Sequence, residues 1–362
     1  MSAPNSSARD SRIEQASAHW SHRMVANGVP LADFQDVTGT ITSWNDWCSA
    51  WVERGGLHEG LGRNALDEGR TLTAGEHLTT AAACYHFAKF LFVKDRDQMR
   101  IAHEKAVSCR TLSLPHLVPQ GERVAIPYDG QILWGNLRKP VGVARPAVVV
   151  MVMGLDSAKE EMHSNEAVFL ARGLATLAFD GPGQGEAEYD LPICPEYERP
   201  VAAVIDWIEG RDDLDSKRVG LWGVSLGGYY APRAAAFEPR VKAVVALTGP
   251  FNFVETFGRA PELTREVFVA RSFSQTEEEA LAVAARMDLG EVAHRVTCPI
   301  HIVGGRLDRV VPPDHAERLA RAVSGPVTLT MVEDGAHVAN NRPYKYRSQT
   351  GDWMARELRA VT

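Results

Sequence analysis

A pentapeptide with the pattern G-x-S-x-G, the sequence GVSLG at residues 223–227, places a serine where it could act as a nucleophile. It follows a strand-like run, residues 218–223, and leads into a helix-like run, residues 226–237. A serine on a sharp turn between a strand and a helix presents its hydroxyl outside the sheet. The N–H groups at the start of the helix suit a developing negative charge. The alternative is a glycine-rich turn with an incidental serine, but this context favours Ser225 as a nucleophile.

A serine hydroxyl also needs a base that takes its proton and an acid that orients the base. Asp308 follows the strand-like run 300–304, and His337 follows the run 327–332. Because parallel strands end at one edge of a sheet, both side chains are expected beside Ser225. We predict that His337 is the base and Asp308 is its orienting acid. The competing residues are His301, interpreted as a core residue, His315, interpreted as a solvated residue, Asp314 and Asp334.

Attack on a carbonyl creates a negative oxygen, which requires hydrogen-bond donors. One expected donor is the backbone N–H of Leu226, the residue after the serine. The second is expected in the loop after the strand-like run 147–153, where Gly154 permits close approach and Leu155 supplies an N–H group. The alternative for this loop is a plain strand-to-helix connection.

The segment FDGPGQGE at residues 179–186 also follows a strand-like run and contains alternating glycines. A nucleotide-binding loop is one interpretation. However, the segment lacks the spacing G-x-G-x-x-G, and no Walker lysine follows it. The sequence therefore favours a tight loop that borders the active site.

Apolar runs alternate with helix-like runs after residue 119, which predicts an α/β fold with a mostly parallel sheet. Asp129-Gly130 is a hairpin signal between the first two strands. The predicted strands are 122–127, 131–139, 147–153, 174–179, 218–223, 241–247, 300–304 and 327–332.

The first 118 residues have helical periodicity instead. Residues 73–92 predict a helix that begins with a capping box, Thr73 followed by Glu76. Trp44, Trp47 and Trp51 have the spacing of one helix face, which indicates a core face or, as an alternative, a dimer interface. A cluster of rings in the same region could be core or pocket lining: Tyr85, His86, Phe87, Phe90 and Phe92.

The composition restricts the class of protein. The formal net charge is −7, so a general nucleic-acid binder is not expected. The five cysteines include no CxxC pair, which argues against a disulfide scaffold and a zinc site. No secretory signal or membrane-length apolar run is evident, so a cytoplasmic protein without membrane association is the expectation.

The motifs together resemble the serine α/β-hydrolases, and within them the 2,6-dihydroxypseudooxynicotine hydrolase-like group. Fungal polyketide chain-shortening hydrolases and FrsA-like esterases are wider relatives. The resemblance rests on GLDSAKEE at residues 154–161, FDGPGQGE at 179–186, SLGG at 225–228 and EPR at 238–240.

This resemblance implies an α/β-hydrolase domain over residues 119–362 with an irregular cap-like segment at 250–290. It also implies that the helical domain, residues 1–118, packs over the hydrolase core and helps build the substrate pocket; the tryptophan spacing leaves dimerisation as a further role of this domain. Ser225, Asp308 and His337 would then form the catalytic triad. The resemblance further implies a catalytic glutamate, for which Glu255 is the candidate, although the sequence alone indicates a surface residue.

The expected activity is hydrolysis of a small activated carbonyl compound. The resemblance favours cleavage of a C–C bond in an aryl ketone or β-diketone. The leaving group is then a carbon that needs a proton, which an additional acid could supply. A carboxylesterase or thioesterase is the alternative enzyme. A ligand-binding protein on a hydrolase scaffold is the alternative of another class. No metal or organic cofactor is implied.

Overall fold

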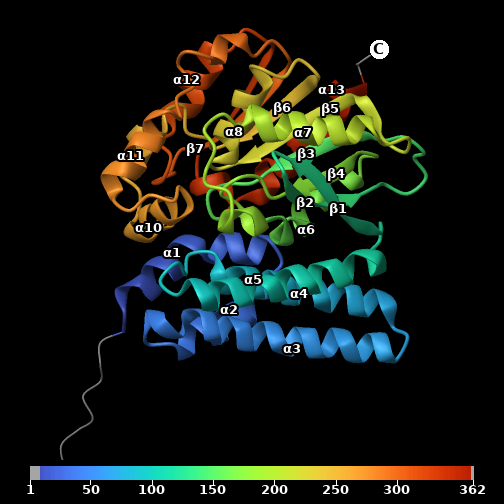
Figure 1. Ribbon diagram of the computed structural model, residues 1–362, viewed down its shortest axis with the longest axis vertical. Helices are drawn as coiled ribbons and strands as arrows, with labels where there is room; N and C mark the ends of the chain where they lie inside the picture. The colour runs from blue at the N-terminus through green and yellow to red at the C-terminus, as the bar shows by residue number, and fades with distance from the viewer. Residues whose placement is uncertain (1–8, 360–362) are drawn as a thin grey trace, which may run out of the picture. The chain divides into compact units, whose positions relative to one another are not determined.

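The computed structural model describes residues 9–359 of the chain. It contains two compact units, divided between His116 and Leu117 (Figure 1). We call the part up to His116 the helical unit and the part from Leu117 the sheet unit.

The helical unit packs long helices closely against one another. A Cβ atom at Gly55 of α3 would lie 2.7 Å from the Tyr85 ring of α4, and one at Gly62 would lie 2.7 Å from the Leu78 side chain. These glycines therefore allow the close contact between α3 and α4. Its elements are α1 (Ser11–Ala26), α2 (Leu31–Thr40), η1 (Trp44–Asp46), α3 (Trp47–Asp67), α4 (Thr71–Lys89), α5 (Arg96–Ser113) and η2 (Leu114–His116).

The tryptophans of this unit are core residues. Trp44, Trp47 and Trp51 are each at most 1% exposed. The Trp44 and Trp47 rings stack with centroids 5.0 Å apart, and Trp47 and Trp51 follow at 6.0 Å. The core interpretation is therefore confirmed, although Trp44 lies in the 3-10 turn η1 rather than on α3.

The predicted capping box of α4 is wrong. The helix begins at Thr71, with Arg70 as its N-cap and no side-chain cap. Thr73 therefore lies inside the first turn, where its backbone is already helical. The pattern Thr-x-x-Glu marked the right region but the wrong residue as the start.

The sheet unit contains an eight-stranded sheet within the described residues, in the order β1-β2-β4-β3-β5-β6-β7-β8. β1 and β2 pair antiparallel, as do β2 and β4, and all other neighbours pair parallel. The predicted mostly parallel sheet is thus confirmed. Its strands are β1 (Gly121–Tyr128), β2 (Gln131–Arg138), β3 (Ala147–Val152), β4 (Ala175–Phe179), β5 (Asp215–Val224), β6 (Val241–Leu247), β7 (Ile300–Gly305) and β8 (Val327–Val332).

Local chemistry explains the hairpin and the central strands. Asp129 and Gly130 both have positive φ, 45° and 75°, as the tight turn between β1 and β2 requires. β3 is buried at every position, which is why its sequence AVVVMV is continuously apolar.

Helices cover both faces of the sheet at β5 (Figure 1). A Cβ atom at Gly220 would meet Met354 of α13, whereas one at Gly223 would meet Ala231 of α8. Positions an odd number apart on a strand face opposite sides, so α13 and α8 lie on opposite faces. The helices of this unit are η3 (Lys159–Glu161), α6 (His163–Leu170), η4 (Gly185–Tyr189), α7 (Glu198–Glu209), α8 (Gly227–Ala235), α9 (Phe253–Phe257), α10 (Glu262–Arg271), α11 (Glu277–Ala285), η5 (Ala293–Arg295), α12 (Asp314–Ala322), η6 (His337–Ala339), η7 (Pro343–Lys345) and α13 (Arg347–Arg359).

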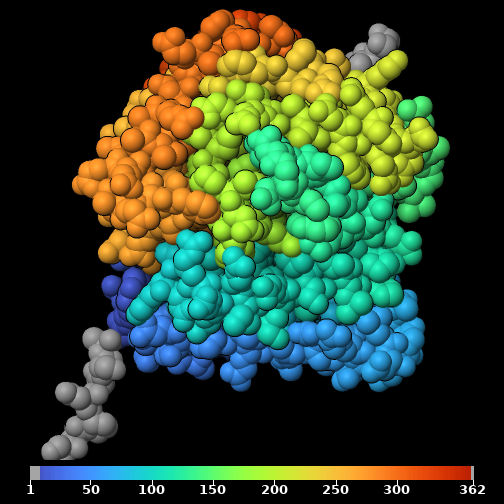
Figure 2. All heavy atoms as spheres, in the orientation of Figure 1, coloured from blue at the N-terminus to red at the C-terminus, as the bar shows by residue number. Residues whose placement is uncertain are grey.

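The segment 250–290 is helical rather than irregular. It consists largely of α9, α10 and α11, and Figure 2 shows it as part of a continuous orange region at one edge of the sheet unit. The rings of Phe253, Phe257 and Phe268 pack with centroids 4.8–6.3 Å apart. This aromatic cluster joins α9 to α10.

Within residues 9–359, none of the helices combines the length and the apolar character that crossing a membrane would require.

Candidate functional site

Ser225 lies on the turn between β5 and α8, where its backbone has a φ of 55°. This left-handed conformation is strained for any residue except glycine. The flanking glycines permit the turn. A Cβ atom at Gly223 would lie 2.0 Å from the Gly227 carbonyl oxygen, and one at Gly228 would lie 2.7 Å from Gly249. The tight packing therefore holds Ser225 in its strained geometry.

The imidazole of His337 joins Ser225 to Asp308. Its Nε2 lies 2.8 Å from the Ser225 hydroxyl, and its Nδ1 lies 2.8 Å from Asp308 Oδ2. The backbone N–H groups of Val310 and Val311 donate to the other carboxylate oxygen, at 2.8 and 2.9 Å. Asp308 and His337 are each only 7% exposed. The structure thus brings these three residues together in a chain suited to moving a proton away from the serine.

The loop that carries His337 has an unusual backbone. Val338 and Ala339 both have positive φ, 58° and 47°. Two side chains stabilise this loop: the Thr248 hydroxyl accepts from the Val338 N–H at 3.2 Å, and Asn341 Oδ1 accepts from the Ala336 N–H at 2.9 Å. Sequence reasoning missed both supports, because neither lies in a recognisable motif.

The loop after β3 lies against the nucleophile turn. A Cβ atom at Gly154 would come within 2.9 Å of the Val224 carbonyl oxygen and 3.2 Å of the Ser225 Cβ. The backbone N–H groups of Leu155 and Leu226 donate no hydrogen bond within residues 9–359. Both N–H groups, on segments that adjoin the serine, are therefore free to bind a developing oxyanion.

A buried ion pair also holds the loop after β3. Arg271 of α10 donates through Nη1 to the Leu155 carbonyl oxygen. Its Nη2 lies 2.9 Å from Glu188 Oε2, and both side chains are at most 2% exposed. Arg271 lies in a segment without a catalytic motif, and the sequence carried no signal for this contact.

Two carboxylates of the segment 179–186 belong to a charged cluster around the buried Lys159, which follows the loop after β3. Lys159 Nζ lies 2.7 Å from Asp180 Oδ2 and 2.6 Å from Glu186 Oε2 and Glu160 Oε1. Burial alone would lower the pKa of Lys159, but the three carboxylates outweigh it and raise that pKa. These ion pairs therefore join Lys159, which follows the loop after β3, to the segment 179–186, which follows β4.

Glu255 lies in an exposed ion pair. Its carboxylate is bonded to Arg318 at 2.6 and 3.1 Å, and its side chain is 47% exposed. It also lies 3.5 Å from His315 Nε2. The hydrogen bonds from Arg318 lower the pKa of the Glu255 carboxyl, which favours its charged form.

The competing residues are occupied elsewhere. His301 is 3% exposed, which confirms its interpretation as a core residue. The interpretation of His315 as solvated is wrong: it is 1% exposed, and its Nδ1 accepts from the Phe251 N–H at 2.9 Å. Asp334 forms exposed ion pairs with Arg342 and Lys345. Asp314 is also exposed.

One group in the helical unit has residue types that could hold a metal. The ligand atoms of Asp33, His58 and Cys84 lie within 4.8 Å of one another. However, Asp33 already binds Arg54 at 2.8 Å and His58 at 2.7 Å. Burial also raises the pKa of the Cys84 thiol, which disfavours the thiolate that a metal would bind. We assign no metal to this group.

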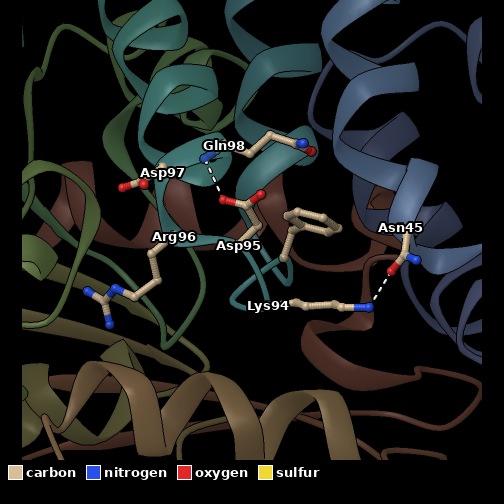
Figure 3. A pocket seen from close by; sticks show the side chains of 7 residues that line it. Asn45, Lys94, Asp95, Arg96, Asp97 and Gln98 are labelled. Carbon is tan, nitrogen blue, oxygen red and sulfur yellow. Dashed lines mark hydrogen bonds between the residues drawn. The ribbon is translucent and has the colours of Figure 1, made fainter.

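A pocket of about 530 Å³ lies at the start of α5 (Figure 3). Asp95 there accepts from the Gln98 N–H at 2.9 Å and so caps the helix, and Lys94 donates to Asn45. These contacts are structural. None of Ser225, His337 and Asp308 lines this pocket. The pocket is lined by Asn45, Phe92, Lys94, Asp95, Arg96, Asp97 and Gln98.

Comparisons with known proteins place the chain among hydrolases. The family model described as Esterase FrsA-like matches residues 32–358. The 2,6-dihydropseudooxynicotine hydrolase of Paenarthrobacter nicotinovorans is 32% identical over 337 residues, which are 92% of this chain and 90% of that protein. Hydrolase LUC6 of Fusarium sp is 33% identical over 230 residues, 59% of this chain and 55% of that protein.

A solved structure gives the same result. The crystal structure of the 2,6-dihydroxy-pseudo-oxynicotine hydrolase superimposes with a TM-score of 0.86 at 30% identity. The match covers 93% of this chain and 95% of that chain. The expected α/β-hydrolase fold and the resemblance found in the sequence are thereby confirmed.

Proposed function

Because the chain belongs to the FrsA-like esterase family of α/β-hydrolases, we propose that it cleaves a small activated carbonyl compound with a triad of Ser225, His337 and Asp308. The observation that carries this proposal is the unbroken hydrogen-bonded chain from the Ser225 hydroxyl through His337 to Asp308, 2.8 Å at each step. Few structural roles require a strained serine beside a buried imidazole and carboxylate.

In the first half of the reaction, the Ser225 oxygen attacks the substrate carbonyl carbon. His337 Nε2 takes the hydroxyl proton, and Asp308 stabilises the resulting imidazolium through Nδ1. The carbonyl oxygen gains negative charge, and the N–H groups of Leu226 and Leu155 bind it. Collapse of this intermediate breaks the bond to the leaving group, which receives the proton from His337. An acyl-enzyme remains on Ser225.

In the second half, water attacks the acyl carbon while His337 takes a proton from it. Collapse returns that proton to Ser225 and releases a carboxylic acid. The balance is one water consumed and one bond hydrolysed, with no change of oxidation state in the protein. The chemistry requires no group beyond the triad and the two backbone donors.

The resemblance to the pseudooxynicotine hydrolase group favours a C–C bond, so we propose an aryl ketone or β-diketone as the substrate. The leaving group is then a carbanion, which a hydroxylated ring or a second carbonyl stabilises. A carbanion must be protonated, and we assign that step to His337. Glu255 is charged because of its pairing with Arg318, and a carboxylate has no proton to donate.

An esterase is the second candidate, favoured by the description of the family as FrsA-like esterases. Alkoxide and thiolate leaving groups need less stabilisation than a carbanion does. The same triad and donors would therefore hydrolyse a carboxylic ester or thioester without any further residue.

Two experiments test the proposal. A turnover screen compares p-nitrophenyl esters with aryl β-diketones, and mass spectrometry of the products identifies which bond is broken. Labelling with a fluorophosphonate then tests the nucleophile: the wild-type protein is expected to gain one phosphonyl group at Ser225, and Ser225→Ala is expected to gain none. Wild-type protein that is neither labelled nor active would contradict the proposal and favour the ligand-binding alternative. Full turnover by Ser225→Ala would instead show that the protein is an enzyme whose nucleophile is not Ser225.

A further inference from the structure

Gln184 lies behind the loop that carries the candidate oxyanion donor Leu155. Its side chain is 1% exposed. The amide nitrogen Nε2 donates to the Met153 carbonyl oxygen at 2.6 Å and to the Gly154 carbonyl oxygen at 3.2 Å. A single buried amide thus binds two successive carbonyl groups of this loop.

The orientation of the Gln184 amide is fixed by the chemistry of its partners. Oε1 accepts from the Gly181 N–H at 3.2 Å and from the Tyr197 hydroxyl at 2.6 Å. A backbone N–H can only donate and a backbone carbonyl can only accept. A flipped amide would therefore place its oxygen against two carbonyl oxygens and its nitrogen against an N–H group. The observed orientation satisfies every group, and Tyr197 reinforces it from a fully buried position.

The Gly154 carbonyl and the Leu155 N–H belong to the same planar trans peptide, so they point in opposite directions. A hydrogen bond that holds the carbonyl also fixes the direction of the N–H. Gly154 adjoins the nucleophile, since a Cβ atom there would lie 3.2 Å from the Ser225 Cβ.

From this geometry we infer that Gln184 is a positioning residue for the oxyanion donor Leu155. This inference rests on the proposed function, because it gives Leu155 a role in the reaction. Gln184 does not touch the substrate. It acts through the peptide that it holds, and its contribution is greatest when negative charge develops on the carbonyl oxygen.

The test uses full-length protein and the rate of phosphonylation of Ser225 by a fluorophosphonate, followed by intact mass. This reaction places a developing phosphoryl oxyanion in the same site and needs no knowledge of the substrate. Gln184→Glu and Gln184→Met remove the two hydrogen bonds that Nε2 donates to the Met153 and Gly154 carbonyl oxygens. The expected result is a rate constant of the covalent step lower by about 10- to 100-fold, with the concentration for half-saturation nearly unchanged. A merely structural role would lower thermal stability without this separation.

Two neighbouring tyrosines provide a matched pair if the Gln184 variants do not fold. Tyr197 and Tyr230 are both fully buried, and their rings stack with centroids 3.9 Å apart. The Tyr230 hydroxyl has no hydrogen-bond partner in the described part of the chain, whereas the Tyr197 hydroxyl donates to Gln184. Tyr197→Phe is expected to slow phosphonylation by about 3- to 10-fold, and Tyr230→Phe is expected to leave it unchanged.

The outcomes separate this inference from the proposed function. If wild-type protein reacts at Ser225 and the folded Gln184 variants, or Tyr197→Phe where those do not fold, react at the wild-type rate, the positioning role is wrong and the triad stands. An equal loss in Tyr197→Phe and Tyr230→Phe would show a packing effect and would also overturn the inference. If wild-type protein does not react, the proposed function fails, and the role of Gln184 fails with it.

Discussion

Replacing Ser225 with glycine is expected to give a more stable protein than replacing it with alanine. Both substitutions remove the hydroxyl and its bond to His337, so their difference isolates the backbone. Ser225 has a φ of 55°, which costs an L-residue about 1–2 kcal/mol relative to glycine. Glycine gains more entropy in the unfolded chain, which offsets about 0.5–1 kcal/mol of this advantage. The expected net difference in unfolding free energy is about 1 kcal/mol in favour of Ser225→Gly.

The measurement is equilibrium urea unfolding at pH 7, followed by circular dichroism, on both variants and on wild-type protein. Ala167→Gly serves as the control, because Ala167 is exposed within the helix α6 of the same unit. Glycine is expected to lower the unfolding free energy there by about 1 kcal/mol. The same residue type should therefore have opposite effects at the two positions.

The reasoning would be refuted if Ser225→Gly were as unstable as Ser225→Ala, or less stable, while the control behaved as expected. That result would mean that the turn around Ser225 holds no strain. If the expected order is found, the fold loses stability at Ser225 in order to hold the side chain of this candidate nucleophile in its orientation.

Three further predictions concern neighbouring groups. Asp308→Asn should lower kcat/KM by about 10³- to 10⁴-fold. The asparagine NH₂ would face His337 Nδ1, so the imidazole proton would stay on Nε2, which could then not accept the Ser225 proton. A loss below about tenfold in steady-state assays would contradict the assigned role. Glu255→Gln should lower kcat/KM by less than about tenfold, because the carboxylate is exposed and paired with Arg318, whereas a 100-fold loss would make it a participant in proton transfer. Burial lowers the pKa of His301 to about 4, so the stability that its neutral form contributes is present above pH 6.5 and is lost as the pH falls from 6.5 to 4. The unfolding free energy should decrease by about 3 kcal/mol over this window, and His301→Gln should remove that decrease in urea titrations; an identical slope in both proteins would refute the assignment.

The sheet could be predicted because its signals are local. β3 and β6 are short apolar runs, the Asp129-Gly130 turn has its own composition, and each strand needs only nearby residues to be recognised. The nucleophile turn was recognisable for the same reason. The candidate base His337 and the candidate acid Asp308 follow from the rule that the carboxyl ends of parallel strands lie at one edge of the sheet. This rule needs only the positions of the strands in the sequence.

The supports of the site could not be predicted, because they depend on distant residues. The buried state of His315 follows from its bond to Phe251, which is 64 positions away in the chain. The orientation of the Gln184 amide depends on Tyr197, and Arg271 reaches the Leu155 carbonyl oxygen across 116 positions. The helices α10 and α11 are not evident from the sequence, because their apolar residues follow the helical period only weakly, whereas those of α8 follow it clearly.

The chain leaves the sheet at the end of β6 and returns to it in β7, the adjacent strand, after the excursion that contains α9 to α11. An insertion whose two ends lie on paired neighbours can change in length and sequence while the pairing of the strands is preserved. Evolution, or a library directed at residues 253–285, can therefore change this insertion while Ser225, His337 and Asp308, which lie outside it, keep their mutual hydrogen bonds. Arg271 is the exception, because it joins this insertion to the loop beside Ser225 through the Leu155 carbonyl oxygen. Arg271 should therefore be kept when the other residues of the insertion are varied.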